Sequence, residues 1–515
     1  MTFSPAEFRN CLKVLKAVDA DRGCLTQLTA EERRELMTLA GLVAKPERHA
    51  LVRMAKAFRR TERAAAQQQD RHAIEQSGLR IQRRSPTYSP LWLPPPDETP
   101  ESAPLTLSSA RACYICKQPY RDVHRYYDSL CRPCGDFNYA RREATADLSG
   151  RYALVTGARV KIGFQTALKL LRAGASVVVS TRFPIDAAER YSQEPDYAGF
   201  RGRLQIHGLD LRHAPSVEVF ARWLTKRLPR LDYLINNACQ TVRRPAGFFQ
   251  HLLQREATPF PDLPRDWQGL LEQHESLCQL VAGTTQSSLQ QPPQSLRQYL
   301  PGQLTVKAAD SPAEGLVHSA ALSQRRYLDE DFQGGEALYP AGQYDEDRQQ
   351  RDLRELNSWR LRLHEVETPE LLEVHLVNAI APYILNARLK PLMMRSGCRD
   401  LHVVNVSAME GQFYRTTKTD RHPHTNMAKA ALNMMTRTSA PDFVRDGIHM
   451  NAVDTGWVTD EDPAIHATRK AELGFAPPLD IIDGAARIVD PIFSGIESGT
   501  HVWGQFLKDY KPAPW

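Results

Sequence analysis

Short apolar runs, separated by turns and by stretches of helical periodicity, recur through two parts of this chain. The first four runs are Tyr152–Val155, Val177–Ser180, Leu204–Leu209 and Leu231–Ile235. Near-continuous apolar runs of this length are typical of strands in a parallel sheet, because helices cover both faces of such a sheet. Strands alternating with helices predict an α/β domain with a doubly wound, Rossmann-type parallel sheet over residues 150–515.

The pattern returns near the C-terminus after a long interruption. Val403–Ser407, Ile448–Val453 and His501–Leu507 predict three more strands. Residues 243–367 are predicted to be an insertion at the carboxyl edge of the sheet, where it would lie over a binding crevice. Within the insertion, residues 344–363 carry an apolar seam that predicts a helix. We expect the insertion to act as a lid or substrate-selecting subdomain, or alternatively to dock a protein partner.

Residues 1–84 are predicted to form a helical module. Ser4 with Glu7, and Thr29 with Glu32, have the spacing of capping boxes at helix starts. Several Arg and Lys residues follow between residues 53 and 63, and we interpret them as a solvated helix face rather than a nucleic-acid contact. The module is predicted to bind a protein partner. Residues 85–106 are rich in proline and predict a linker.

Four cysteines form two closely spaced pairs within residues 107–149. Fourteen residues separate the Cys113-x-x-Cys116 pair from the Cys131-x-x-Cys134 pair. Two such pairs supply the four thiolates of a tetrahedral Zn²⁺ site, and four thiolates leave no open position, so the zinc would be structural. His124 is an alternative ligand to one of the cysteines. The site is predicted to dock beside the first strand of the α/β domain.

Composition narrows the class of protein. The chain has 515 residues, a net charge of +6 and an apolar fraction of 42%, enough for more than one core. The charge is too small for a dedicated nucleic-acid binder. The N-terminus lacks the apolar core of a signal peptide, and no apolar stretch reaches about 18 residues. We therefore expect a cytoplasmic protein that does not enter a membrane.

The strand, turn and helix from Arg151 to Leu171 would present backbone N–H groups and a helix N-terminus to a pyrophosphate. The turn reads Thr156-Gly157-Ala158-Arg159-Val160-Lys161-Ile162-Gly163. With the strands that follow, it resembles the short-chain dehydrogenase/reductase family over residues 150–243 and 368–508. The resemblance implies that Thr156, Gly157, Arg159, Lys161, Ile162 and Gly163 bind a dinucleotide. Lys161 replaces the middle glycine of the family motif, and it would either clamp a phosphate or mark lost cofactor binding.

Residues at the ends of the next strands indicate which cofactor would bind. Arg182 follows the second strand where an acidic residue would hold the ribose of NAD(H), so it favours the 2′-phosphate of NADP(H). The resemblance implies that Asp210 and Leu211 lie beside the adenine. It also implies that Asn237 and Ala238 belong to the family's Asn-Asn-Ala-Gly motif. Further along the chain, Gly456, Val458 and Thr459 resemble the loop beside the nicotinamide.

The catalytic positions depart from the family pattern. Asn378 matches an asparagine of the family's proton relay, and Lys429 matches its lysine. However, Ala408 occupies the position of the active serine, and Thr425 that of the tyrosine. A threonine hydroxyl is a far weaker acid than a phenol of pKa about 10. Tyr414, His422 and His424 are therefore the nearby candidates for handling the proton, with water as the alternative.

Two functions follow from these residues, and we favour the first. The chain is predicted to be an NADP(H)-dependent oxidoreductase that acts on a small-molecule carbonyl or alcohol with atypical catalytic residues. The alternative is a non-catalytic NADP(H)-binding sensor or scaffold. A zinc-containing nucleic-acid binder with a decayed α/β domain is a third, less favoured hypothesis. Many family members form oligomers, which the extra segments here could block or replace.

Overall fold

The computed structural model describes residues 3–83, 105–288, 313–322, 324–332, 334–345, 347–414 and 418–515. The chain divides into two compact units, residues 1–72 and 73–515. Most of the predicted linker, and the part of the insertion between residues 289 and 312, lie outside the described residues. Within the described ranges, no helix combines the length and apolar character that a membrane crossing requires.

The first unit is helical, as expected. It contains α1 (Pro5–Ala20), a 3₁₀ segment (Arg22–Gln27), α2 (Ala30–Ala44) and most of α3 (Arg48–Glu75). Both predicted capping boxes are present, at Ser4 and at Thr29. Neither α1 nor α2 buries a single side chain within this unit. Capping and local propensity therefore account for these helices, with no apolar core of their own.

The second unit is built on an eight-stranded sheet of order β10-β9-β8-β7-β6-β3-β4-β5. Strands β3 to β9 are parallel, and β10 pairs antiparallel with β9 at the edge. The strands are β3 (Tyr152–Thr156), β4 (Ser176–Thr181), β5 (Leu204–Gly208), β6 (Tyr233–Asn236), β7 (Leu401–Ser407), β8 (Ile448–Asp454), β9 (Phe506–Lys508) and β10 (Lys511–Ala513). The seven predicted strands are thus confirmed, with shifted ends, and the sequence did not predict β10.

Two apolar cores cover the two faces of this sheet. Ala153 and Val155 of β3 point into one core, whereas Leu154 between them points into the other. This alternation is the period of two that a strand imposes on its side chains. Since both faces are buried, the strands could be predicted as near-continuous apolar runs.

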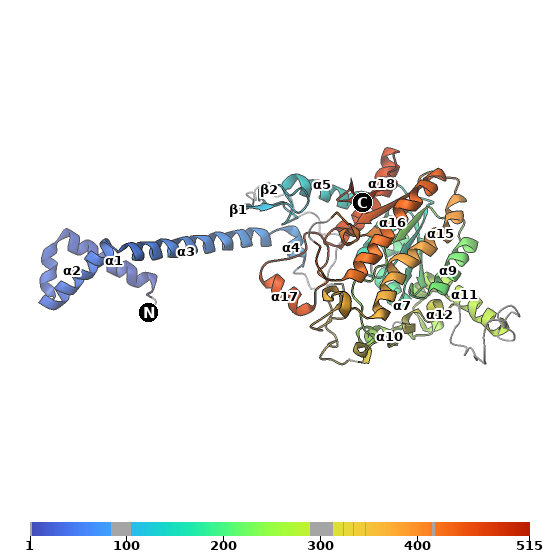
Figure 1. Ribbon diagram of the computed structural model, residues 1–515, viewed down its shortest axis with the longest axis horizontal. Coiled ribbons are helices and arrows are strands. Elements are labelled where there is room, and N and C mark those ends of the chain that lie inside the picture. Colours follow the sequence, from blue (N-terminus) through green and yellow to red (C-terminus); the bar gives the residue numbers. More distant parts are fainter. Residues whose placement is uncertain are drawn as a thin grey trace. The chain divides into compact units, whose positions relative to one another are not determined.

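Helices form the outer layers on either side of the sheet (Figure 1). The first core joins the sheet to α6 (Lys161–Arg172), α7 (Pro184–Ser192) and α18 (Ile481–Ser498). The second core joins it to α9 (Ala214–Arg227), α15 (Ala381–Met394) and α16 (Pro423–Arg445). The remaining helices of this unit are α8 (Tyr197–Phe200), α10 (Gln250–Glu256), α11 (Arg265–Ser288), α12 (Glu314–Val317), α13 (Ser319–Leu322), α14 (Thr368–His375) and α17 (Ala464–Glu472).

The cysteine module consists of α4 (Gly78–Arg83), β1 (Thr106–Ala112), β2 (Pro119–Asp122) and α5 (Arg132–Glu143). It packs mainly against α18 rather than beside the first strand, which corrects the prediction. The Tyr127 hydroxyl donates to Asp483 at 2.5 Å, and the Arg142 guanidinium donates to Asp480 at 2.6 Å. Asp480 and Asp483 form the capping box that begins α18. The module therefore docks on the charged N-terminus of a helix, a partner that local sequence cannot identify.

The predicted helix over residues 344–363 is wrong. The chain turns at Asp345, whose carboxylate accepts hydrogen bonds from the N–H groups of Asp347 and Gln349. Arg348 has a φ of +55°, which no helix tolerates. The expected apolar seam is mostly solvent-exposed, because Leu356 and Leu363 are 55% and 73% accessible. The leucines have helical spacing, but no helix forms because the aspartate side chain stabilises a turn instead.

Candidate functional site

A cavity of about 1650 Å³ opens where the parallel strands end. Its walls come from the first turn of α6, from the loops that follow β4 to β8, and from the insertion. The cysteine module also reaches the cavity, through Tyr114 and Lys117. Carboxyl ends of parallel strands are the place where α/β sheets bind ligands. One end of the cavity lies at β4 and β5, and the other lies at β7, β8 and β9.

The turn between β3 and α6 has the tight backbone expected of a dinucleotide site. Gly157 has a φ of +65°, and a Cβ there would lie 2.8 Å from the Cα of Ala238. A Cβ on Gly163 would lie 2.3 Å from the side-chain nitrogen of Asn237. That amide in turn donates to the carbonyl oxygens of Thr156 and Gly157. Two glycines and one asparagine thus hold the turn against the end of β6.

Lys161 occupies its position in a backbone conformation that favours glycine. Its φ is +56°, in the left-handed region. Its ammonium lies 3.8 Å from the Asp347 carboxylate of the insertion. Burial works to lower the pKa of Lys161, but Glu461 and Asp347 together raise it above the ordinary value. The side chain is therefore a cation held by acidic neighbours.

The N-terminus of α6 faces the cavity. Val160 is its N-cap residue and provides no side-chain hydrogen bond, while residues 160–163 all line the cavity. The first N–H groups of a helix lack partners within the helix and favour an anion. The geometry of this turn therefore fits a pyrophosphate.

Arg182 lies at the end of β4 and lines the cavity. Its guanidinium stacks on Phe249, 4.6 Å from the ring centre. Burial and the nearby Arg212 guanidinium lower the pKa of Arg182 to about 10. Among the described residues, none accepts a hydrogen bond from this guanidinium or forms an ion pair with it. An unpaired, partly buried arginine is a ready site for a phosphate group.

Two other predicted residues at this end are engaged in ion pairs. The Arg159 guanidinium lies 2.6 Å from Asp186, and Asp210 lies 2.6 Å from Arg212. Although burial has the opposite effect, Arg212 holds the pKa of Asp210 below its usual value. Leu211 lines the cavity beside these groups, whereas Thr156 is buried behind the turn and accepts from the N–H of Ala238 at 3.1 Å.

At the other end of the cavity, the polar side chains of β7 and α16 mostly form hydrogen bonds within the protein. Ser407 donates to Asn433 at 2.6 Å, so its hydroxyl is occupied. Ser407 and Ala408 both line the cavity, and the Ala408 side chain brings no polar group. Lys429 also lines the cavity, and its ammonium donates to the carbonyl oxygen of Val406 at 2.8 Å. Two further N–H donors of that ammonium remain available to a ligand.

Three other predicted catalytic residues are not brought to the cavity. Among the described residues that line it, His424, Thr425 and Tyr414 are absent. His424 is buried and points toward Glu370 of α14, 3.6 Å away. The Thr425 hydroxyl is buried without a hydrogen-bond partner. The Tyr414 side chain is 45% exposed and contacts the sulfur of Met409.

Asn378 has a structural partner. It lies in a π-helical turn, Leu376–Ile380, between α14 and α15. Its side-chain amide donates to the carbonyl of Gln240 at 3.0 Å and accepts from the N–H of the same residue at 2.8 Å. Turns of this kind interrupt a helix and are frequent at functional sites. Here Asn378 fixes the loop after β6, and Gln240 faces the cavity in its place.

Several cavity residues were missed by the sequence. Asp454 and Lys508 stand at the carboxyl ends of β8 and β9, and a rule based on strand ends could have found them. His422, which the sequence did predict as a candidate for the proton, lines the cavity. Its ring stacks flat on Trp359 of the insertion, with 4.0 Å between ring centres. Burial lowers the pKa of His422 to about 4. Tyr114 lies more than 300 residues earlier in the chain than the loops it meets, and no sequence signal connects them.

The remaining predicted cofactor residues follow β8. Gly456, Val458 and Thr459 all line the cavity. Gly456 has a φ of +77°, and its N–H donates to Asp454 at 2.6 Å. The Thr459 hydroxyl donates to Glu461 at 2.8 Å. The loop is thus a tight turn set by one aspartate and one glycine.

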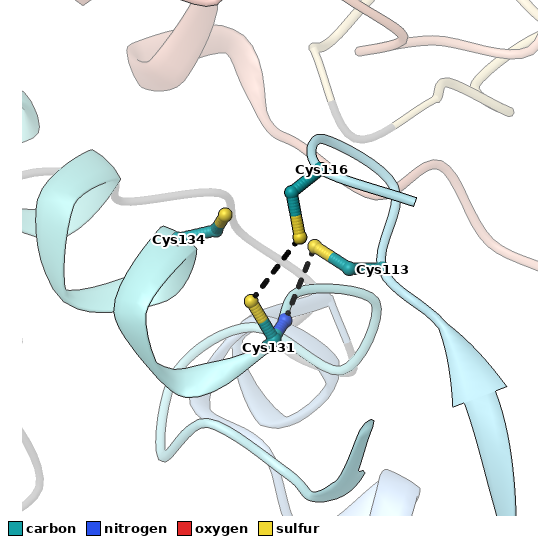
Figure 2. Close-up of side chains that lie close together, drawn as sticks. All are labelled: Cys113, Cys116, Cys131 and Cys134. Atoms are coloured by element: carbon teal, nitrogen blue, oxygen red, sulfur yellow. Dashed lines mark hydrogen bonds between the residues drawn. The ribbon is translucent and has the colours of Figure 1, made fainter. Parts of the chain in front are cut away.

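The four cysteines of the module converge on one point (Figure 2). Their sulfur atoms all lie within 4.8 Å of one another. The sulfurs of Cys116 and Cys131 are 3.7 Å apart, close to the ~3.8 Å that tetrahedral Zn–S bonds of about 2.3 Å require. The N–H of Cys131 points at the sulfur of Cys113. His124 is not part of the group, because its ring accepts from the N–H groups of Tyr126 and Tyr127.

Comparison with known proteins gives two matches to protein families. Residues 151–256 match the family described as "short chain dehydrogenase", and residues 357–472 match the one described as "Enoyl-(Acyl carrier protein) reductase". The two matched stretches flank the central part of the insertion. They include both the dinucleotide turn and the α16 region.

Individual relatives are similar over different lengths. An uncharacterized protein, R665, of Acanthamoeba polyphaga mimivirus is 32% identical over 412 residues, which is 78% of this chain and 75% of the relative. A probable oxidoreductase of Streptomyces antibioticus is 47% identical over 93 residues, or 18% of this chain and 30% of the relative. Mouse retinol dehydrogenase 14 is 37% identical over 116 residues. The match spans 34% of that relative and 20% of this chain.

Solved structures resemble the chain at low identity. A short-chain dehydrogenase from Streptomyces avermitilis has a TM-score of 0.37 at 17% identity and covers 67% of this chain and 84% of its own. An NADPH-bound carbonyl reductase from chicken fatty liver has a TM-score of 0.40 at 16% identity. That match covers 72% of this chain and 100% of the reductase.

Proposed function

This chain belongs to the short-chain dehydrogenase/reductase family, and from that premise we propose that it is an NADP(H)-dependent oxidoreductase acting on a carbonyl compound or alcohol. One observation carries the choice of cofactor. The unpaired guanidinium of Arg182 stands at the end of β4, against Phe249 and inside the cavity. That position meets the ribose in Rossmann folds, and a cation there suits a 2′-phosphate.

The residues that would hold the cofactor come from the whole length of the cavity. Gly157, Gly163 and the uncapped start of α6 would take the pyrophosphate, and Arg182 the 2′-phosphate. Lys429 and Thr459 face the far end, where they would hold the nicotinamide ribose and amide. NADP(H) would supply the hydride of a carbonyl–alcohol interconversion at that end.

The proton requires a different source from the family's tyrosine. Thr425 and His424 are buried and do not line the cavity. Tyr414 does not line it either, although its hydroxyl contacts the sulfur of Met409, which does. We therefore propose that a water molecule in the open cavity exchanges the proton. The ammonium of Lys429 would hold this water. Lys429 has spare donors for this purpose, and as a cation it stabilises negative charge that develops on the substrate oxygen.

The insertion supports a role in substrate selection more than in partner docking. Arg244, Phe248 and Trp359 of the insertion line the cavity directly. Its own charges hold it in place, since Arg243 forms ion pairs with Glu330 and Asp331. A segment fixed in this way along the cavity would shape the space open to a substrate.

The cysteine group is proposed to hold a structural Zn²⁺. The sulfur spacing fits a tetrahedral site, and four thiolates close the coordination shell. Thiolates must stay reduced to bind the metal, which agrees with a cytoplasmic location. We assign no chemistry to this metal.

The test of the function is a cofactor titration of the full chain, followed by a search for turnover. NADPH is expected to bind at least ~10-fold more tightly than NADH, as judged by cofactor fluorescence, because a charge-assisted bond to Arg182 contributes about 1.5–3 kcal/mol. NADPH oxidation is then followed at 340 nm with a panel of aldehydes and ketones. Equal affinity for the two cofactors would contradict the assignment of Arg182.

The same experiment distinguishes the proposed enzyme from an alternative function. Ala408 and Thr425 at the family's serine and tyrosine positions favour a non-catalytic NADP(H)-binding sensor or scaffold. That protein would bind NADPH with the same preference and consume none with any substrate. Turnover with even one carbonyl substrate would exclude it.

A further inference from the structure

The metal-binding turn of the cysteine module places one of its own side chains inside the cofactor cavity. Tyr114 lies between Cys113 and Cys116, two of the four converging cysteines. Its ring lines the cavity, and its hydroxyl accepts a hydrogen bond from the N–H of Trp457 at 3.0 Å. Trp457 directly follows Gly456 in the loop beside the predicted nicotinamide position. A single hydrogen bond therefore joins the metal turn to the cofactor loop.

The cofactor loop depends on contacts from outside itself. Gly456 has a φ of +77°, and a Cβ at that residue would lie 2.5 Å from Leu479 and 3.6 Å from the Tyr114 hydroxyl. The N–H of Leu479 donates to the carbonyl of Trp457 at 3.3 Å. The backbone of Trp457 is thus held by two hydrogen bonds, its N–H by Tyr114 and its carbonyl by Leu479.

The position of Tyr114 depends on the metal turn in several ways. Its N–H donates to the carbonyl of Ser129, which lies two residues before Cys131. The neighbouring Cys113 is fully buried. Lys508 lies 5.7 Å from the centre of the Tyr114 ring. Without a metal, four clustered thiols lose the bonds that fix their relative positions, so the turn and its tyrosine lose their fixed geometry.

We propose that Tyr114 is a positioning residue that links metal binding at the four cysteines to NADP(H) binding in the cavity. The proposal rests on the proposed function, because it assumes that the loop after β8 meets the cofactor. Linkage of this kind is reciprocal: metal strengthens cofactor binding, and cofactor strengthens metal binding by the same coupling free energy. The cysteine module would then be part of the cofactor site and not only a structural support.

The experiment measures NADPH affinity on the full chain, with Zn²⁺ bound and after its removal by a chelator. The wild-type protein is expected to bind NADPH about 10-fold more weakly without metal. Tyr114→Phe keeps the ring and the cysteines but loses the hydroxyl, and one hydrogen bond of about 0.5–1.5 kcal/mol corresponds to roughly 3–10-fold weaker NADPH binding with zinc retained. Removing zinc from this variant should then have a smaller effect than in the wild type.

The control and the reciprocal measurement keep the outcome clear. Tyr120→Phe is the matched control, because the Tyr120 hydroxyl donates to Asp128 within the same module and not to the cofactor loop. It should leave NADPH affinity unchanged. Saturating NADPH should slow the release of Zn²⁺ to a chromogenic chelator in the wild type, and slow it much less in Tyr114→Phe. This second readout does not require the metal-free protein to stay folded.

Two results would overturn the inference. NADPH affinity that is unaffected by zinc removal in the folded wild-type protein, or equal in wild type and Tyr114→Phe, removes the link while leaving the proposed function intact. A zinc-loaded wild type that binds no NADPH removes the proposed function and the link together. The two failures are therefore distinguishable from the wild-type titration alone.

Discussion

The two ends of the cavity have departed from the family pattern with different consequences. At the nucleotide end, Lys161 replaces a glycine, yet the backbone there keeps the left-handed φ of +56°. At the reaction end, Ala408 and Thr425 replace a serine and a tyrosine, and neither brings a polar group to the cavity. The first change leaves the turn in a left-handed backbone conformation, whereas the second leaves the reaction end without the family's serine and tyrosine.

The difference arises from what each end is made of. Phosphate binding uses backbone N–H groups and a helix terminus, which most side chains leave intact. A non-glycine residue in the left-handed region costs only about 1–2 kcal/mol. Proton transfer instead depends on the acidity of one side chain, which a neighbouring residue cannot supply from another place. A binding function is therefore more tolerant of substitution here than a catalytic one.

The largest expected effect comes from a substitution that disrupts the nucleotide end of the cavity. Gly163→Val should abolish NADPH binding and destabilise the fold, because a Cβ there already lies 2.3 Å from the Asn237 amide. Overpacking of this kind typically costs about 1–3 kcal/mol or more. Thermal denaturation and NADPH titration would measure both effects. Gly269→Ala in α11 is the control, since a Cβ at that glycine meets nothing within 4 Å. It should leave NADPH binding unchanged and should not lower stability, because alanine favours a helix over glycine.

A smaller effect concerns cofactor choice at the same end. Arg182→Ala should weaken NADPH binding about 10–100-fold and leave NADH binding nearly unchanged, because only the 2′-phosphate needs the guanidinium. The comparison of the two dissociation constants is the measurement. Arg222→Ala, on the exposed face of α9, is the matched control. Equal losses for both cofactors would instead indicate damage to the fold at the end of β4.

At the reaction end, restoring the family tyrosine should not restore activity. Thr425→Tyr would force a phenol into a site that is 1% exposed and does not line the cavity. We expect a loss of about 1–3 kcal/mol in the free energy of unfolding and no gain in turnover. Ala408→Ser lies at the cavity wall and should fold like the wild type. A rise in turnover with Thr425→Tyr would show that the side chain reaches the cavity after all.

The smallest expected effect is a pH dependence. His422 has a pKa of about 4 when folded, against an ordinary value near 6.5. The unfolded chain therefore binds more protons between these values, and stability falls as the pH is lowered through this window. His422→Asn should lose less stability between pH 7 and pH 5 than the wild type, as measured by thermal denaturation. An unchanged loss would assign the acid sensitivity to other buried histidines, such as His274.

Much of the fold was already determined by the sequence. The apolar runs of β3 to β9 are buried on both faces, so burial alone makes them recognisable. The four cysteines lie close together in the chain, and their spacing reveals them. The dinucleotide turn shows in the sequence as a strand, a glycine and a helix, although its contacts at Asn237 and Ala238 come from a distant strand end. The capping boxes at Ser4 and Thr29 also depend only on residues three positions apart. In each case the forces are local or follow from a simple pattern of burial.

Only the tertiary structure decided what reaches the cavity. His424 and Lys429 lie five residues apart on α16, yet the rotation of that helix buries one against Glu370 and turns the other toward the cavity. Tyr114 meets Trp457 because the cysteine module docks on the N-terminus of α18. The Asn378 side-chain amide forms hydrogen bonds with the backbone of Gln240. Side-chain direction and long-range docking depend on packing between distant segments, and the order of residues along the chain does not reveal that packing.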